Sequence, residues 1–324
     1  MNILVTGGSG FIGTNYIEYL LNLENVKFLN LDKAIPRNPA HKPYWTDCDL
    51  LNAIAVKEVV RKFSPTHVVH LAAETGVDKK KLNEFAANIE GVENLISALN
   101  EVGTVQQALF TSSLLVCKMG YIPKHDTDYL PSTIYGESKV KGEIIVRNAN
   151  IDQYLWTIIR PISIWGPWGE EPYRNFFKAI AQGWYFHIGS GHYRRSLGYV
   201  GNTVHQIHHM LLAPAEKVDK KIMYVADDQP TDLYDMANMI GEAIGARKIF
   251  HIPLWMAKLA ALIGDMCKII GWQTVPISSF RLNNIRTEYI FDLSPIINIS
   301  GPLPINMETG VKQTVQWLRE MKEI

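Results

Sequence analysis

The first half of the chain alternates between short apolar runs and segments with helical periodicity. The runs are rich in β-branched and aliphatic residues and occupy positions 3–5, 26–31, 66–73, 107–111 and 155–160. In the segment 88–100 the apolar residues recur every three or four positions, and 134–149 is a second, longer helix candidate. Strands that alternate with helices in this way predict an α/β fold with a parallel sheet.

The pattern becomes irregular after residues 166–167. The second half is aromatic and glycine-rich and has shorter periods, although 221–226 still predicts a strand and 233–244 a helix. No low-complexity linker or charge run separates the two halves. We therefore expect a second lobe that is interwoven with the first, rather than a module that folds alone.

Residues 254–272 are the only segment apolar enough to suggest contact with a membrane. Lys258, Asp265 and Lys268 interrupt the segment, and its apolar positions repeat at helical spacing. This pattern favours an amphipathic helix packed on its own domain, and we expect no membrane partner.

Three glycines follow the first apolar run with the spacing G-x-x-G-x-x-G: Gly7, Gly10 and Gly13. Glycine lacks the Cβ that would keep a pyrophosphate away from backbone N–H groups, and a helix N-terminus favours the negative charge. Asp32 follows the second run, where a carboxylate can bind ribose hydroxyls and repel the extra phosphate of NADP. The alternative is a turn that only connects two elements, but the strand before it and the helix after it favour an NAD site.

Tyr135 and Lys139 lie four positions apart in the helix expected at 134–149, so both side chains project from one face. A nearby ammonium stabilises phenolate and should lower the tyrosine pKa, which would let Tyr135 exchange a proton with a substrate hydroxyl. Ser113, at the end of the run 107–111, is placed to hold the same oxygen. Such Tyr–Lys pairs are common on solvated helices, but together with the glycine turn and Ser113 they favour catalysis.

These motifs together resemble the extended short-chain dehydrogenase/reductases, and within them the NAD-dependent epimerase/dehydratase family that acts on nucleotide sugars. The resemblance runs essentially end to end. Its motifs are the segment 6–13, Asp32, the pair 49–50, the segment 70–73, Asn88, Ser113, Tyr135, Lys139 and the segments 160–161 and 165–167. The family's fold implies a Rossmann-type doubly wound parallel sheet with a smaller, interwoven α/β C-terminal substrate lobe.

The resemblance also implies where the ligands bind. Residues 1–165 would form the NAD-binding domain, to which about 195–226 would return, and 166–324 would be mainly the substrate lobe. The residues implied to contact NAD are Gly7, Gly10, Phe11, Ile12, Gly13, Asp32, Asp49, Leu50, Leu71, Ala72, Ala73, Asn88, Tyr135, Lys139 and Pro161.

The same resemblance implies that Ser113 orients the substrate oxygen, that Tyr135 is the acid and base, and that Lys139 adjusts the pKa of Tyr135. The substrate lobe matches less closely. The residues implied to bind substrate there are Asn175, Arg195 and Arg281, with Arg286 as a competitor for the place of Arg281. The alternative for these arginines is that they are exposed surface side chains that bind no substrate.

Leu114 and Leu115 stand where the sugar dehydratases of this family carry an Asp–Glu pair, and leucine cannot transfer protons. Removal and return of a hydride at one carbon needs only the serine, tyrosine, lysine and NAD. The sequence therefore predicts an NAD-dependent nucleotide-sugar 4-epimerase. One alternative is an NAD-dependent sugar or hydroxysteroid-type dehydrogenase or ketoreductase, and another is an NAD-binding scaffold without catalysis.

The composition argues against some kinds of partner and cofactor. The chain has 324 residues with 32 basic and 32 acidic side chains, so it has no net field that would attract nucleic acid. Its three cysteines are scattered, as in proteins of a reducing cytoplasm, which is the location we expect. The histidine pairs lack carboxylate neighbours, and we expect no metal. Relatives pair through two long helices, which implies a homodimer here.

Overall fold

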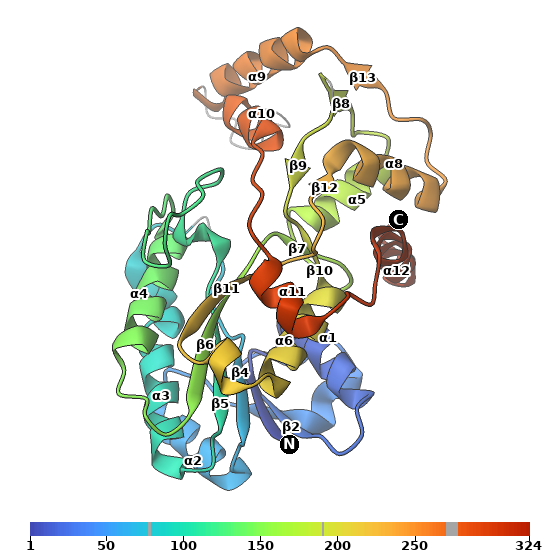
Figure 1. The fold of residues 1–324 in the computed structure, drawn as a ribbon. Coiled ribbons are helices and arrows are strands. Elements are labelled where there is room, and N and C mark those ends of the chain that lie inside the picture. The colour runs from blue at the N-terminus through green and yellow to red at the C-terminus, as the bar shows by residue number, and fades with distance from the viewer. Residues whose placement is uncertain (77–78, 190, 270–277) are drawn as a thin grey trace.

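The computed structural model describes residues 1–76, 79–189, 191–269 and 278–324 (Figure 1). Over this part of the chain the main sheet has seven strands, and every neighbouring pair is parallel. In spatial order the strands are β11 (Lys221–Val225), β6 (Leu155–Pro161), β5 (Gln107–Thr111), β4 (His67–His70), β1 (Asn2–Thr6), β2 (Lys27–Asp32) and β3 (Trp45–Asp47). The order reverses between β1 and β4, which confirms the predicted Rossmann-type doubly wound sheet.

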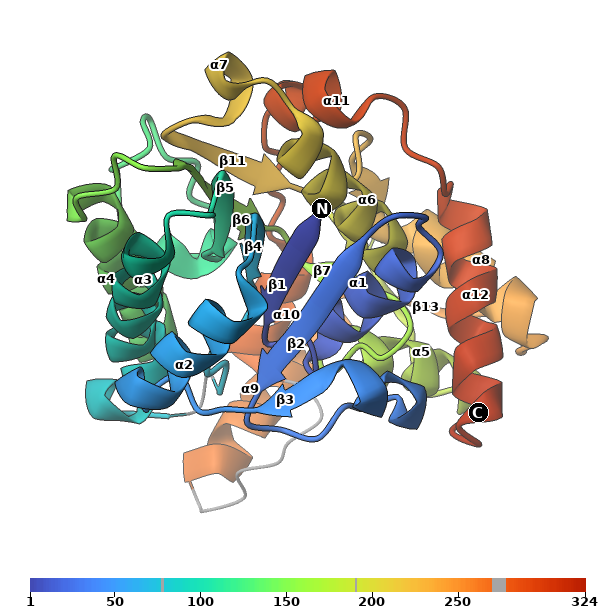
Figure 2. The same cartoon turned by 90° about the horizontal axis from the view of Figure 1, so that it is seen from below.

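Helices cover both faces of this sheet (Figure 2). One face carries α1 (Phe11–Leu21), α6 (Val200–Leu212) and α11 (Ser294–Ser300), and the other carries α2 (Ala53–Phe63), α3 (Glu90–Val102) and α4 (Ile134–Asn148). Side chains along β1 alternate between them: Ile3 and Val5 pack with the α1 and α6 layer, and Leu4 packs with the α2 and α3 layer. Burial on both faces explains why these strands are continuous apolar runs.

The second lobe has its own apolar cluster. Trp165, Phe177, Ile240 and Leu318 meet there, contributed by β7 (Ile164–Trp165), α5 (Tyr173–Ala181), α8 (Leu233–Ile244) and α12 (Met307–Glu320). The chain crosses between the two lobes more than once. α5 and α8 belong to the second lobe, but α6 and β11, which lie between them in the sequence, pack with the main sheet. The division of the chain at residue 165 stays a prediction.

Short elements complete the described structure. They are η1 (Pro39–Tyr44), η2 (Leu82–Asn88), η3 (Leu114–Val116), β8 (His187–Ile188), β9 (Arg194–Arg195), β10 (Gly198–Tyr199), α7 (Ala215–Val218), β12 (Thr231–Asp232) and β13 (His251–Ile252). β13 pairs with β8 and leads directly into α9 (Leu254–Ile269), which packs on α10 (Ser279–Arg286).

The expectation that the segment 254–272 packs its apolar face on its own domain is wrong for its large residues. α9 is a helix as predicted, but its contact with α10 is made by Ala257 and Ala261, which are buried with Leu282. Small side chains allow close approach of the two helices, and the large apolar ones are left facing outward. Residues 270–272 lie outside the described part. None of the helices described is long and apolar enough to span a membrane.

Candidate active site

The glycine turn lies between the end of β1 and the start of α1. Gly7 has φ +74°, and a Cβ there would stand 2.4 Å from the backbone nitrogen of Ala72. A Cβ on Gly13 would stand 2.1 Å from the Gly7 carbonyl oxygen, so helix and strand pack too closely for any side chain. At Gly10 the nearest atom is the same carbonyl at 3.2 Å, and the rest of the surrounding space is open.

This open space adjoins the first turn of α1, where Phe11 and Ile12 follow Gly10. Gly10 is the residue before the helix, and no side chain caps its N–H groups. Uncapped N–H groups at a helix N-terminus beside a space that a Cβ would fill are a fit for the pyrophosphate of a dinucleotide.

Asp32 is held next to this turn at the end of β2. Its carboxylate accepts hydrogen bonds from the backbone N–H groups of Ser9 and Ala34, at 3.0 and 2.9 Å. Burial raises the pKa of Asp32, and these hydrogen bonds act in the opposite direction. A carboxylate can accept further hydrogen bonds beyond two. The position and chemistry of Asp32 therefore fit ribose hydroxyls.

Asp49 and Leu50 lie just after β3. Asp49 accepts a hydrogen bond from the N–H of Leu51 at 3.0 Å, and the Lys33 ammonium is 3.8 Å from its other oxygen. Lys33 is therefore directed at Asp49 rather than at Asp32, its sequence neighbour. Leu50 is buried in the cluster beneath α2 and α3.

The segment after β4 carries Leu71, Ala72 and Ala73 past the glycine turn. Asn88 fixes the loop that follows. Its Oδ1 accepts from the Glu74 N–H at 2.8 Å, and its Nδ2 donates to the Glu74 carbonyl and to Ser138 Oγ, each at 2.9 Å. Asn88 thus ties the loop to α4 and positions its neighbours.

Ser113 and Tyr135 are brought together by β5 and α4. Both are buried, and the Ser113 side chain lies near enough to Tyr135 to lower the pKa of its phenol. Ser113 Oγ also accepts from the Leu115 N–H at 3.1 Å, which fixes the serine at the start of η3. The pair sits where the carboxyl ends of the parallel strands meet, which is the ligand-binding edge of such sheets.

The expected lowering of the Tyr135 pKa by Lys139 is wrong for this structure. Burial raises the pKa of Tyr135, and the nearby Ser113 side chain opposes that rise. The Lys139 ammonium is instead directed at the end of β5, where Nζ donates to the Thr111 carbonyl at 2.8 Å. Burial also lowers the pKa of Lys139 to about 8, against the effect of Glu143.

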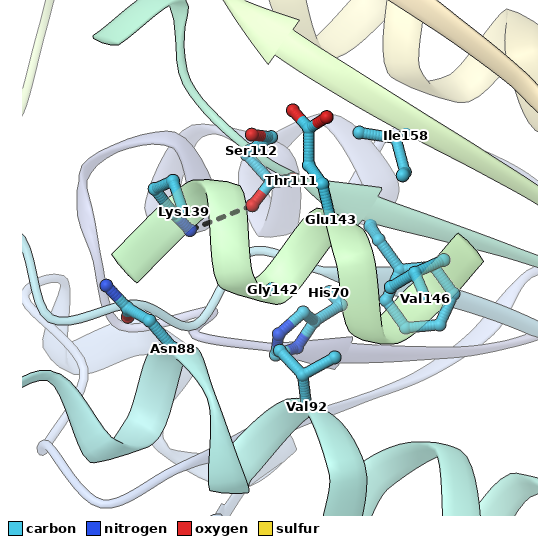
Figure 3. Close-up of a pocket in the computed structure, with 11 residues that line it drawn as sticks. His70, Asn88, Val92, Thr111, Ser112, Lys139, Gly142, Glu143, Val146 and Ile158 are labelled. Atoms are coloured by element: carbon cyan, nitrogen blue, oxygen red, sulfur yellow. Dashed lines mark hydrogen bonds between the residues drawn. The ribbon is translucent and has the colours of Figure 1, made fainter. Parts of the chain in front are cut away.

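A small cavity of ≈ 20 Å³ lies beside Lys139 (Figure 3). Figure 3 shows Lys139 and Glu143 of α4 near Thr111 and Ser112, with His70 on the neighbouring strand. The hydroxyls of Thr111 and Ser112 are buried and have no hydrogen-bond partner among the groups described. A polar cavity of this size can hold a water molecule.

Two buried groups at this cavity, Glu143 and His70, were given no role by sequence reasoning. Glu143 forms a buried ion pair with Arg160, in which Nε and Nη2 of the arginine donate to the two carboxylate oxygens at 2.8 and 2.7 Å. His70 Nδ1 lies 2.6 Å from Thr6 Oγ1, and burial lowers the pKa of His70 to about 3, helped by the Lys139 ammonium. The i, i+4 spacing between Lys139 and Glu143 on the predicted helix could have indicated that Glu143 lies beside the lysine.

Arg37 was also missed, and nothing in its local sequence marks it. Its Nε donates to the carbonyl of Ser9 in the glycine turn at 3.2 Å, and its Nη1 donates to the carbonyl of Trp168 at 2.9 Å. It also forms an ion pair with Glu170. Arg37 therefore joins the glycine turn to the loop that follows β7.

Arg195, implied to bind substrate, is directed at the end of α10. Its guanidinium donates to the carbonyls of Asn284, Ile285 (2.8 Å) and Thr287 (3.0 Å). It also lies over the ring of Tyr289, 5.2 Å from the ring centre. A cation beside the last carbonyls of a helix stabilises the helix end.

Tyr289 links this region to the main sheet. Its hydroxyl is 2.9 Å from Ser163 Oγ, two residues beyond Pro161 at the end of β6. The other two implied substrate ligands lie farther out. Arg281 is exposed on α10, and Asn175 is exposed on α5, where it donates to Glu171 at 2.6 Å.

Among the residues described, no group of three or more His, Cys, Asp or Glu side chains is arranged to hold a metal ion.

The chain is similar in sequence to two characterised enzymes. The chain is 28% identical to an N-acetyl-α-D-glucosaminyl-diphospho-ditrans,octacis-undecaprenol 4-epimerase of Escherichia coli O157:H7, over 98% of this chain and 95% of that one. It is 31% identical to a 3β-hydroxysteroid dehydrogenase/Δ5→4-isomerase of Mycobacterium tuberculosis, over 76% of this chain and 70% of the relative.

Two solved structures show the same fold. A UDP-glucose 4-epimerase from Thermotoga maritima, crystallised with UDP-glucose, superposes with a TM-score of 0.76 at 19% identity, covering 99% of this chain and 100% of that one. A UDP-glucuronic acid 4-epimerase from Bacillus cereus in complex with NAD gives 0.76 at 17% identity, with 99% of each chain covered.

The sequence profile that matches residues 3–226 is that of the NAD dependent epimerase/dehydratase family. The match covers more than half of the chain and spans the glycine turn, Asp32, Ser113, Tyr135 and Lys139. The protein therefore belongs to the NAD-dependent epimerase/dehydratase family of enzymes, and its cofactor is NAD.

Proposed function

We propose that this enzyme is an NAD-dependent 4-epimerase of a sugar carried on a diphosphate. The observation that carries the proposal is the buried pair of Ser113 and Tyr135 at the carboxyl edge of the sheet, where the serine side chain is near enough to lower the pKa of the phenol. NAD, when bound, supplies the acceptor and donor of hydride. Gly7, Gly10 and Gly13 with Asp32 would hold it.

Tyr135 is the proposed acid and base. Its phenolate oxygen takes the proton of the sugar hydroxyl as the carbon is oxidised, and the resulting phenol returns the proton on reduction. Ser113 holds the same sugar oxygen through its own hydroxyl. Burial raises the pKa of Tyr135, so its phenolate is costly, and Ser113 is the neighbour that opposes this rise.

The residues beside Ser113 support epimerisation over elimination. Leu114 is buried and Leu115 is half-buried in η3, directly after the serine. Neither side chain can donate or accept a proton, so that position offers no acid or base for loss of water.

The diphosphate is what the proposed carriers have in common. Sequence analysis expects a nucleotide carrier, and the Escherichia coli relative is named for a sugar on undecaprenyl diphosphate. Arg281 and Arg286 on α10 are the proposed phosphate ligands. The Nε of Arg286 is buried without a hydrogen-bond partner in the described structure, which supports its selection. Arg195 orients α10 through its carbonyls.

A second candidate is a hydroxysteroid-type dehydrogenase. The identity of 31% with a mycobacterial 3β-hydroxysteroid dehydrogenase favours it, and the same serine, tyrosine and lysine would serve. The scaffold alternative has less support, because the serine, tyrosine and lysine of the proposed mechanism are all present, and Ser113 and Tyr135 are both buried.

Incubation of the purified protein with NAD and each substrate class tests these assignments. UDP-glucose, N-acetylglucosaminyl-diphospho-undecaprenol and a 3β-hydroxysteroid are compared, with products identified by NMR and NADH by its absorbance. An epimer formed without net NADH supports the proposal. NADH formed in proportion to steroid supports the dehydrogenase, and NAD binding without any turnover supports the scaffold.

The homodimer through helices that include 88–100 and 134–149, and the location in the cytoplasm, remain predictions.

A further inference from the structure

The outward face of α9 is built from large apolar side chains. Six of them are between 45% and 67% exposed: Trp255, Met256, Leu259, Leu262, Ile263 and Met266. They recur every three or four residues and so form one stripe along the helix. Figure 1 shows α9 at the outer end of the molecule, with α10 between it and the sheet.

This arrangement is the reverse of an ordinary surface helix. The face that packs on α10 carries Ala257 and Ala261, and the larger residues point to the outside. A helix stabilised by its own domain places its large apolar residues inward. Contiguous exposed apolar patches of this kind mark interaction sites.

The strands before α9 extend the apolar surface. Phe250, four residues before the helix, is 68% exposed, and its carbonyl accepts a hydrogen bond from the His187 N–H at 2.9 Å. Phe186, the residue just before β8, is also exposed, as Phe250 is the residue just before β13. The apolar side chains therefore continue from the β8–β13 pair onto α9.

The charge around the stripe selects its partner. The whole chain has no net charge, yet residues 247–286 contain six basic side chains and one acidic one. The basic residues are Arg247, Lys248, Lys258, Lys268, Arg281 and Arg286, and the acidic residue is Asp265. Apolar residues flanked by lysine and arginine match the interface of an anionic bilayer. A second copy of this face would bring like charges together and be repelled.

The length of α9 determines how it would meet a bilayer. Sixteen residues of helix span about 24 Å, which is shorter than the hydrocarbon core of about 30 Å. The helix therefore lies along the interface and does not cross it.

We propose that α9, with Phe250, is a docking surface for an anionic phospholipid bilayer. This departs from the expectation of no membrane partner, which was based on spanning segments. α9 packs on α10, and Arg195 and Tyr289 join the end of α10 to the end of β6. Docking thus brings the substrate side of the site to the bilayer. Docking would then present the site to a sugar diphosphate carried on a membrane lipid, and this part of the inference rests on the proposed function.

Vesicle flotation of the full-length protein tests the docking. We expect co-flotation with phosphatidylglycerol-containing vesicles, little with phosphatidylcholine vesicles, and release by salt. The double variant Leu259→Glu/Ile263→Glu should reduce the partition coefficient about tenfold or more. Ile54→Glu is the matched control, since Ile54 is 73% exposed on α2 at a distance from the basic segment, and it should bind as the wild type does.

Lys258→Glu is the second test, because it changes charge while leaving the apolar stripe intact. It should weaken binding to anionic vesicles only. The proposal is overturned if the wild type does not float with anionic vesicles, or if the double variant binds them equally well. It is also overturned if the double variant changes only the oligomeric state. Flotation needs no turnover, so its failure leaves the proposed epimerase untouched, and failure of the activity assay leaves docking untouched.

Discussion

Both carboxylate oxygens of Glu143 accept hydrogen bonds from Arg160, at 2.8 and 2.7 Å, and both side chains are about 1% exposed. The ion pair lies one helical turn beyond Lys139, whose pKa Glu143 raises against the effect of burial. A structural pair thus contributes to the charge of Lys139, a proposed catalytic residue.

Replacing Glu143 by Gln should destabilise the protein strongly. The substitution keeps the shape but leaves the Arg160 charge buried without a counter-ion, a loss of about 3–5 kcal/mol in the free energy of unfolding. Urea unfolding measures this. Glu137→Gln is the control, because Glu137 makes an exposed pair with Lys141 and should change stability by less than about 1 kcal/mol. Equal effects of the two variants would contradict the role given to Glu143.

Removing the Tyr135 hydroxyl should slow turnover strongly and leave NAD binding nearly unchanged. Tyr135→Phe loses the acid and base, so kcat should fall by about 10²–10⁴-fold, with NAD binding within about twofold of the wild type. Rate measurements and NAD titration check this. Tyr154→Phe is a matched control, because that hydroxyl is also buried but has no hydrogen-bond partner in the described structure. Retained activity in Tyr135→Phe would rule out the mechanism.

Lys139 should give the stability a specific pH dependence. Burial lowers its pKa from 10.5 to about 8, so between these pH values the unfolded chain binds more protons than the folded protein. The free energy of unfolding should therefore rise with pH in this window. Below about pH 8 Lys139 is charged in the folded protein, and the buried charge then lowers the free energy of unfolding by about 3 kcal/mol.

Comparison with Lys139→Met isolates this effect from other titrating groups. The variant should be more stable than the wild type at neutral pH, and the difference should shrink as pH rises toward 10.5. It should also lose activity, because Lys139 is one of the residues proposed to contact NAD. A pH-independent difference in stability would show that Lys139 has an ordinary pKa.

Two glycines of the turn should respond differently to alanine. In Gly13→Ala the new Cβ would stand 2.1 Å from the Gly7 carbonyl, so the fold should be destabilised along with NAD binding. In Gly10→Ala the Cβ meets only that carbonyl at 3.2 Å, so the protein should fold and lose NAD affinity by about tenfold or more. Thermal unfolding and NAD titration separate the two. Unchanged NAD affinity in Gly10→Ala would contradict the pyrophosphate site.

The sequence alone predicted the sheet and the glycine turn with its carboxylate, because their signals are local. The strand predicted at 107–111 and the helix predicted at 233–244 have the bounds of β5 and α8. Apolar periodicity and glycine spacing are written in consecutive residues, and the backbone conformations they favour depend little on distant partners.

Only the tertiary structure decided how side chains from distant segments are used. It directed Arg195 to the carbonyls of α10, placed Glu143 against Arg160, and left the large residues of α9 facing outward. It also determined the pKa values of Tyr135 and Lys139, which both follow from burial. Burial and pairing depend on which residues meet in space, and spacing along the chain does not encode this.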